Sequence, residues 1–229
     1  MYTEVHPFPE FIPANAKALI VGSFPPVKLS IKNLFSISGS NKKLYDEYFL
    51  SKRNQRSEKD IDYYYGSSNN MFWDLIGAAF NCEINTKDDM ISFLTTKKIG
   101  ITDLVEKCHR KETKRKPSRQ NPNNVGVGSL DSDLSAIEFR DVMQSIKDHN
   151  IKKVYCTSRF VKKLLLELDE SKILNNSNVQ VVVLPSPSPA SSRSIGREAT
   201  YKALLKSGIV KNTKDYRIIR YKEIFKDMI

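Results

Sequence analysis

The fold is decided by residues 16–22, AKALIVG, near the start of this 229-residue chain. The run is short and almost wholly apolar, and it ends at a glycine, which is typical of a buried parallel strand that leads into a turn. Three further runs predict strands of the same sheet, at residues 98–105, 151–157 and 179–184. The last is the richest in β-branched residues, which favour strands.

Amphipathic stretches alternate with these strands and predict helices, at residues 70–80, 86–96, 136–149, 160–168 and 197–206. Strands that alternate with helices indicate parallel βαβ units. We therefore expect an α/β fold, a three-layer α/β/α sandwich around a mainly parallel sheet of about four strands. The length and composition favour one domain, residues 1–229.

Two segments depart from the alternation. Residues 26–61 are rich in Ser, Asn and Lys and predict an insertion after the first strand. Residues 106–128 predict a basic loop after the second, which carries Lys111, Lys114, Arg115 and Lys116. The pattern at residues 216–229 fits an edge strand or a helix and leaves its role open.

Composition narrows the class of protein. Lys and Arg number 37 against 26 Asp and Glu, so the formal net charge is +11, which favours a polyanionic partner such as a nucleic acid. No run approaches the ~18 apolar residues of a membrane span, and the first residues do not open a signal peptide. We expect an intracellular, cytoplasmic monomer.

Cysteines and histidines are few and scattered: Cys82, Cys108, Cys156, His6, His109 and His149. Their spacing fits neither a disulfide scaffold nor a metal or iron–sulfur site. We expect no metal and no cofactor.

The first motif is the turn Gly22-Ser23-Phe24-Pro25-Pro26, directly after the first strand. Glycine permits a sharp turn, after which backbone N–H groups can point at a carbonyl or phosphate. The alternative is that this turn is only an ordinary exit from the strand, and the five residues taken alone favour that structural role over ligand binding.

The second motif is YYGSSNNMFW, residues 64–73. Tyr65 could stack on a base, because base–aromatic stacking is worth ~1–3 kcal/mol. Asn70 offers an acceptor and a donor that could position a water or read a base edge. Helix capping by Asn70 is as well supported as catalysis, while Trp73 is expected in the core.

The third motif is LPSPSPASS, residues 184–192, called the Ser/Pro loop below. Prolines fix φ, so the hydroxyls of Ser186 and Ser188 are held in place and could grip phosphates without reading sequence. Arg193 follows and could reach a phosphate or fill the gap left by a flipped base. A polyproline linker is the weaker alternative, because periodic structure resumes on both sides.

These motifs resemble those of the uracil-DNA glycosylase superfamily, and most closely its deoxyinosine (hypoxanthine) glycosylase branch. That branch has a G-S-[FM]-P turn, a Y-Y-[AG]-H-P-x-N-x-F-W segment and an L-P-S-T-S-P-A loop. The matches follow in family order over residues 16–206, with weaker ones at 100–105 and 128–133. Asn70 falls on the helix-start asparagine that this branch uses catalytically.

The chain departs from the family at four places. Phe24 stands where mismatch-specific uracil glycosylases have a catalytic asparagine. Ser67 and Ser68 replace the usual histidine and proline, which leaves the choice of base open. Leu184 stands where many relatives have a histidine that contacts the base carbonyl, and residues 26–61 are longer than the family norm.

The resemblance implies a monofunctional DNA glycosylase of base excision repair, acting on hypoxanthine or uracil in DNA. Gly22, Ser23, Phe24 and Tyr65 would then hold the flipped base, and Asn70 would orient the attacking water. Ser186, Ser188, Arg193 and the four cations of the basic loop would bind the DNA strand.

Two other function classes compete with this one. The first is a catalytically inactive DNA-binding module of the same fold, which the departures at residues 67, 68 and 184 favour. The second is a nucleotide-processing enzyme unrelated to DNA. It would need a phosphate site, and the sequence holds neither G-x-G-x-x-G nor a P-loop.

Overall fold

The computed structural model describes residues 3–30, 56–110, 112–114, 125–127 and 134–228. Its central sheet has four parallel strands, in the spatial order β3 (Ile99–Asp103), β2 (Ala18–Gly22), β8 (Lys153–Cys156) and β9 (Gln180–Val183). All four come from the expected apolar runs. They point the same way, so their carboxyl ends share one edge, called the carboxyl edge below.

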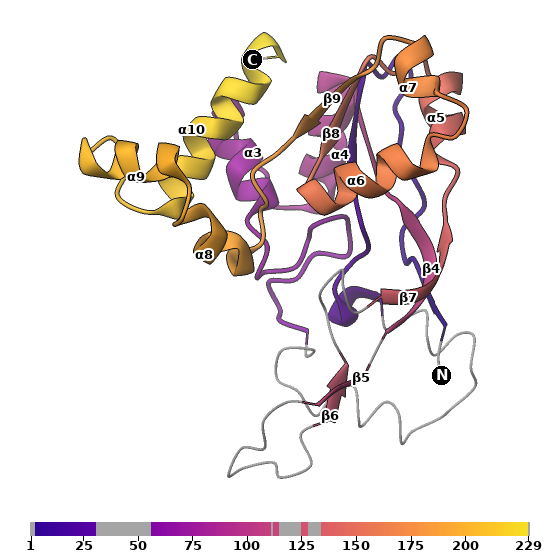
Figure 1. Cartoon of the computed structure of the whole chain (residues 1–229), viewed down its shortest axis with the longest axis horizontal. Coiled ribbons are helices and arrows are strands. Elements are labelled where there is room, and N and C mark those ends of the chain that lie inside the picture. Colours follow the sequence, from indigo (N-terminus) through magenta and orange to yellow (C-terminus); the bar gives the residue numbers. More distant parts are fainter. Residues whose placement is uncertain (1–2, 31–55, 111, 115–124, 128–133, 229) are drawn as a thin grey trace.

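Helices cover both faces of this sheet (Figure 1). One face packs on α3 (Phe72–Phe80), α4 (Lys87–Lys97) and α10 (Thr213–Phe225), and the other on α5 (Val142–Asp148), α6 (Arg159–Leu168) and α7 (Ile173–Asn176). Successive side chains of a strand point to opposite faces. Ile20 therefore enters the first core and Leu19 the second. The expected α/β/α sandwich is confirmed.

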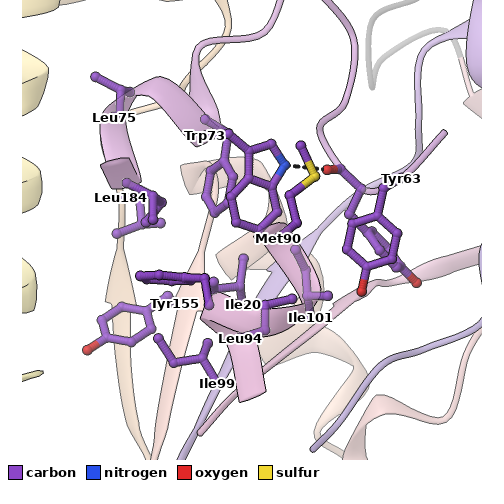
Figure 2. Close-up of a cluster of buried hydrophobic side chains, with 14 of the residues drawn as sticks. Ile20, Tyr63, Trp73, Leu75, Met90, Leu94, Ile99, Ile101, Tyr155 and Leu184 are labelled. Carbon is purple, nitrogen blue, oxygen red and sulfur yellow. Dashed lines mark hydrogen bonds between the residues drawn. The ribbon is translucent and has the colours of Figure 1, made fainter. Parts of the chain in front are cut away.

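The first core surrounds Trp73, whose indole Nε1 donates a hydrogen bond to the carbonyl oxygen of Tyr64 at 2.7 Å (Figure 2). Leu184 lies in the same cluster and is 1% exposed. The two later motifs thus begin or end in the core, which fixes their position relative to the sheet.

A second, antiparallel sheet joins β1 (Glu4–Val5), β4 (Val105–Arg110) and β7 (Leu134–Phe139), and β5 (Glu112–Lys114) pairs with β6 (Val125–Val127). The expectation of a loop over 106–128 is therefore wrong for residues 106–110, 112–114 and 125–127. Two cations of β4 form ion pairs with neighbouring strands of this sheet: Lys107 pairs with Glu138 of β7, and Arg110 pairs with Glu4 of β1. Opposite charges on neighbouring strands stabilise such pairing.

The helix expected at 136–149 is also wrong in its first part, because residues 134–139 form β7 and α5 begins only at Val142. The partner of β7 is β4, which lies about thirty residues away, and a local pattern does not reveal such pairing. Of the expected insertion, residues 27–30 are helical, and residues 31–55 lie outside the described part.

The C-terminal third ends in α8 (Ser192–Ile195), α9 (Ala199–Lys206) and α10, which lie together beside α3 (Figure 1). Residues 216–225, for which the sequence fits either an edge strand or a helix, are thus helical. It packs on α3 through Tyr221, which contacts Phe72 and Phe225 in the first core.

Candidate functional site

Three adjoining strands bring Gly22, Asp103 and Thr157 to the carboxyl edge. Gly22 and Asp103 are register partners in β2 and β3, and the N–H of Thr157 donates to the carbonyl of Val21 at 3.0 Å. Tyr65 reaches over them: its Oη donates to Asp103 Oδ1 at 3.3 Å and lies 3.5 Å from Thr157 Oγ1. The contact is tight enough to require glycine. A Cβ on Gly22 would lie 1.9 Å from Tyr65 Oη and 2.2 Å from Asp103 Oδ1.

Tyr65 is held from two sides. Its backbone has φ +55°, a left-handed conformation that few residues other than glycine adopt. Its ring lies 4.5 Å from that of Phe72, centroid to centroid, at 34°. Burial, and then the Asp103 carboxylate, raise the pKa of Tyr65 well above its usual value. The phenol therefore stays protonated and acts as a hydrogen-bond donor at neutral pH.

Asp103 has a second partner, His6, whose Nε2 lies 2.9 Å from Asp103 Oδ2. Both are buried, with exposed fractions of 4% and 5%. On the other side of the ring, His6 Nδ1 lies 2.8 Å from the carbonyl oxygen of Phe8 and 3.1 Å from the nitrogen of its N–H. The sequence reasoning missed both residues. The register with Gly22 could have signalled Asp103, whereas nothing local signals His6.

The turn after β2 is anchored to the second sheet. Arg110 Nη2 donates to the carbonyl of Pro25 at 2.6 Å, and its guanidinium carbon lies 5.3 Å from the ring centroid of Phe24. Phe24 also meets His6 edge-on at 5.5 Å. The carbonyl of Ser23 accepts the N–H of Val105 at 3.0 Å. The ring of Phe24 thus lies between His6, just after β1, and Arg110 at the end of β4.

Asn70 lies just before α3 and is half-buried. Its Oδ1 accepts the N–H of Phe72 at 2.9 Å, and its own N–H donates to the carbonyl of Ser67 at 2.7 Å. The side chain therefore satisfies one of the free N–H groups of the helix start. A carboxamide oxygen has two lone pairs and the nitrogen two hydrogens, so the group can still bind a water or a base.

The Ser/Pro loop follows β9 at the carboxyl edge and touches this segment directly. The N–H of Met71, next to Asn70, donates to the carbonyl of Pro187 at 3.2 Å. Ser186 and Ser188 are half-buried, and Arg193 is exposed on α8. The structure thus brings Gly22, Tyr65, Asn70 and the loop to one edge.

The four cations of the predicted basic loop lie outside the part of the chain that the structure describes. Lys111, Arg115 and Lys116 are not among the described residues, and only the backbone of Lys114 is described. Within the described part, no group of three or more His, Cys, Asp or Glu side chains could hold a metal ion, and no helix has the length and apolar character to cross a membrane. A hollow of about 380 Å³ is lined by residues of α5 and by the residues around Ile173.

Ser68, two residues before Asn70, is bound by a buried ion pair. Lys28 Nζ lies 2.6 Å from Asp60 Oδ1, and the side chains are 4% and 0% exposed. The same oxygen accepts the N–H of Ser68 at 2.7 Å, and Asp60 Oδ2 accepts the N–H of Ser57 at 2.7 Å. Burial alone would raise the pKa of Asp60, but the bonds from Lys28, Ser57 and Ser68 together outweigh it and lower the pKa to about 2.

We expect Asp60→Asn to lower the free energy of unfolding at pH 7 by about 2 kcal/mol or more. A depressed pKa gives stability that is present above the unfolded-state value of about 4 and lost as the pH falls through 2. Denaturant titrations between pH 7 and pH 2 should therefore show the gap between wild type and variant closing toward pH 2. Asp74→Asn, at an exposed ion pair with Lys214, is the control. A gap that is the same at both ends of the range would contradict the assignment.

Comparison with known proteins shows a likeness in structure and none in sequence families. No protein-family model and no curated protein sequence matches the chain. A solution NMR structure from Methanosarcina acetivorans, described as a putative uracil DNA glycosylase, matches with 20% identity and a TM-score of 0.49, over 90% of this chain and 98% of that one. A likeness of that degree carries no argument about function, which rests on the residues of the carboxyl edge.

Proposed function

We propose that the chain is a monofunctional DNA glycosylase that flips a deaminated base, hypoxanthine or uracil, out of DNA and hydrolyses its N-glycosidic bond. The observation that carries this proposal is the gathering of Tyr65, Asn70 and the Ser/Pro loop at the carboxyl edge. Open parallel sheets bind their ligands there. The site offers an aromatic ring, a carboxamide and fixed hydroxyls, which suit a base, a water and a phosphodiester.

In the proposed reaction, Tyr65 stacks on the extruded base, with its hydroxyl fixed by Asp103 and Thr157. Backbone N–H groups near Gly22 and Ser23 bind the base carbonyl and stabilise the negative charge that builds on the departing base. Asn70 orients the water that attacks C1′ as the bond to the base breaks. A carboxamide is a weak base, so it contributes orientation more than proton abstraction.

The binding-module alternative has an observation of its own. Asn70 already uses its oxygen on the N–H of Phe72, and Leu184 lies in the core. Both facts fit a chain that keeps the fold and a DNA-binding surface but does not excise a base.

Excision assays separate the two. The purified chain should release free base from single- or double-stranded oligonucleotides that contain hypoxanthine, uracil or xanthine, and should leave abasic sites with the backbone uncut. Tight, salt-dependent binding to the same oligonucleotides with no base release would favour the binding module.

The basic segment gives a separate prediction about affinity. The prediction concerns a variant in which four cations are neutralised together: Lys111, Lys114, Arg115 and Lys116. This variant should bind duplexes of any sequence more weakly and with a flatter salt dependence, because each phosphate contact releases counterions. The charge-matched control changes four exposed lysines that precede strands or lie at the end of a helix or just after it, at the opposite end of the sheet: Lys17, Lys147, Lys152 and Lys172. Equal salt slopes for the two pools would show that the segment is only a solvated run of charge.

A further inference from the structure

Arg217 of α10 is completely buried, with an exposed fraction of 0%. Its guanidinium reaches the Ser/Pro loop: Nε donates to the carbonyl of Ser186 at 2.9 Å, and Nη2 donates to the carbonyl of Ser188 at 3.2 Å and to Ser191 Oγ at 2.8 Å. Its described partners are carbonyl and hydroxyl oxygens, with no carboxylate among them. Burial lowers the pKa of Arg217, but arginine stays protonated in proteins. A full positive charge therefore lies behind the loop.

The carbonyl groups of residues 185–188 in the loop all accept hydrogen bonds from other parts of the chain. Tyr221 Oη donates to the carbonyl of Pro185 at 3.2 Å, and Met71 N–H takes that of Pro187 at 3.2 Å. Arg217 binds the carbonyls of Ser186 and Ser188. Of these four consecutive carbonyl groups, three are therefore bound by side chains of α10. The backbone of this stretch therefore has no free face of acceptors to offer a ligand.

The hydroxyls that remain are donors. Ser186 Oγ accepts the N–H of Ser188 at 3.4 Å, and Ser188 Oγ accepts the N–H of Ala190 at 3.3 Å. A serine hydroxyl that accepts in this way keeps its own hydrogen to donate. Donors in front of an uncompensated buried cation suit an anion, because a buried charge is costly until an opposite charge compensates it.

We propose that Arg217 is the positioning residue of this loop: its hydrogen bonds hold the backbone that carries the Ser186 and Ser188 hydroxyls, and its charge attracts a DNA phosphate to those hydroxyls. This inference rests on the proposed function only in taking DNA as the ligand. Arg217 contacts neither base nor water, so it acts on affinity rather than on the chemical step.

The test compares Arg217→Gln and Arg217→Lys in the full chain. The control is Arg220→Gln, on the exposed side of the same helix, where Arg220 pairs with Glu223. The affinity for an undamaged 20-mer is measured over a range of salt concentrations, and single-turnover excision at saturating DNA is measured separately. Thermal unfolding of each variant reports how much protein is folded.

Arg217→Gln should weaken DNA binding about tenfold or more and reduce the salt slope by up to about one, with excision at saturating DNA changed less than about threefold. Arg217→Lys keeps the charge but loses the planar fork, so it should recover the slope and only part of the affinity. Weaker binding in a chain that excises nothing would support this inference and refute the excision function.

A purely structural role predicts a lower melting temperature with an unchanged dissociation constant for the folded protein, and that result would overturn the proposal. If Arg217→Gln does not fold, Arg217→Lys decides. Wild-type affinity in that variant would overturn the proposal, because the lost fork removes the hydrogen bonds from Arg217 to the carbonyls of Ser186 and Ser188.

Discussion

Asn70→Ala is expected to slow base excision at saturating DNA by about 100-fold or more, while the affinity for DNA stays within about threefold of wild type. The carboxamide acts when water attacks C1′, so its loss raises the barrier rather than weakening ground-state binding. The same change removes the acceptor for the N–H of Phe72. A loss of ~1 kcal/mol in unfolding free energy should accompany it.

Two variants separate catalysis from capping. Asn70→Asp keeps an oxygen for Phe72 and should restore stability, but it loses the amide donor and brings a negative charge, so excision should remain slow. Asn69→Ala changes the exposed neighbour and should keep wild-type rates and stability. Full excision by folded Asn70→Ala protein would refute the catalytic assignment and leave capping as its role.

Gly22→Ala is expected to destabilise the chain by about 1 to 3 kcal/mol and to reduce excision at least about tenfold. The added methyl group would stand 1.9 Å from Tyr65 Oη and 2.2 Å from Asp103 Oδ1, so the tyrosine or the carboxylate must move. Displacement of Tyr65 would misplace the surface on which the base stacks. Denaturant unfolding and single-turnover excision measure the two effects.

A double variant shows whether Tyr65 causes the loss. Tyr65→Phe removes the atom at 1.9 Å, so adding it to Gly22→Ala should recover part of the stability that the alanine costs. Gly196→Ala is the control, since its Cβ would come no nearer than 3.3 Å to another group. Additive losses in the double variant would show that Gly22 and Tyr65 do not interact.

The sequence predicts the central sheet because its strands are mostly apolar, and β2, in the interior of the sheet, is buried on both faces along its whole length. It fails at β4 and β7, where exposed charges alternate with buried residues and the pairing is between distant segments. The candidate site divides in the same way. Tyr65 and Asn70 stand in a recognisable local pattern, whereas His6 and Arg217 reach their places through contacts across 97 and 31 residues, which no local pattern encodes.

The dependence of the Ser/Pro loop on α10 has a consequence for the order in which the molecule matures. Ribosomes make β2, β3, β8 and β9 before they make Arg217 and Tyr221, so the sheet can form while the loop still lacks the side chains that hold its carbonyl groups. Domains begin to fold during synthesis, from the N-terminus onward. The surface proposed to grip DNA is therefore completed last, and a nascent chain that already has its sheet does not yet present it.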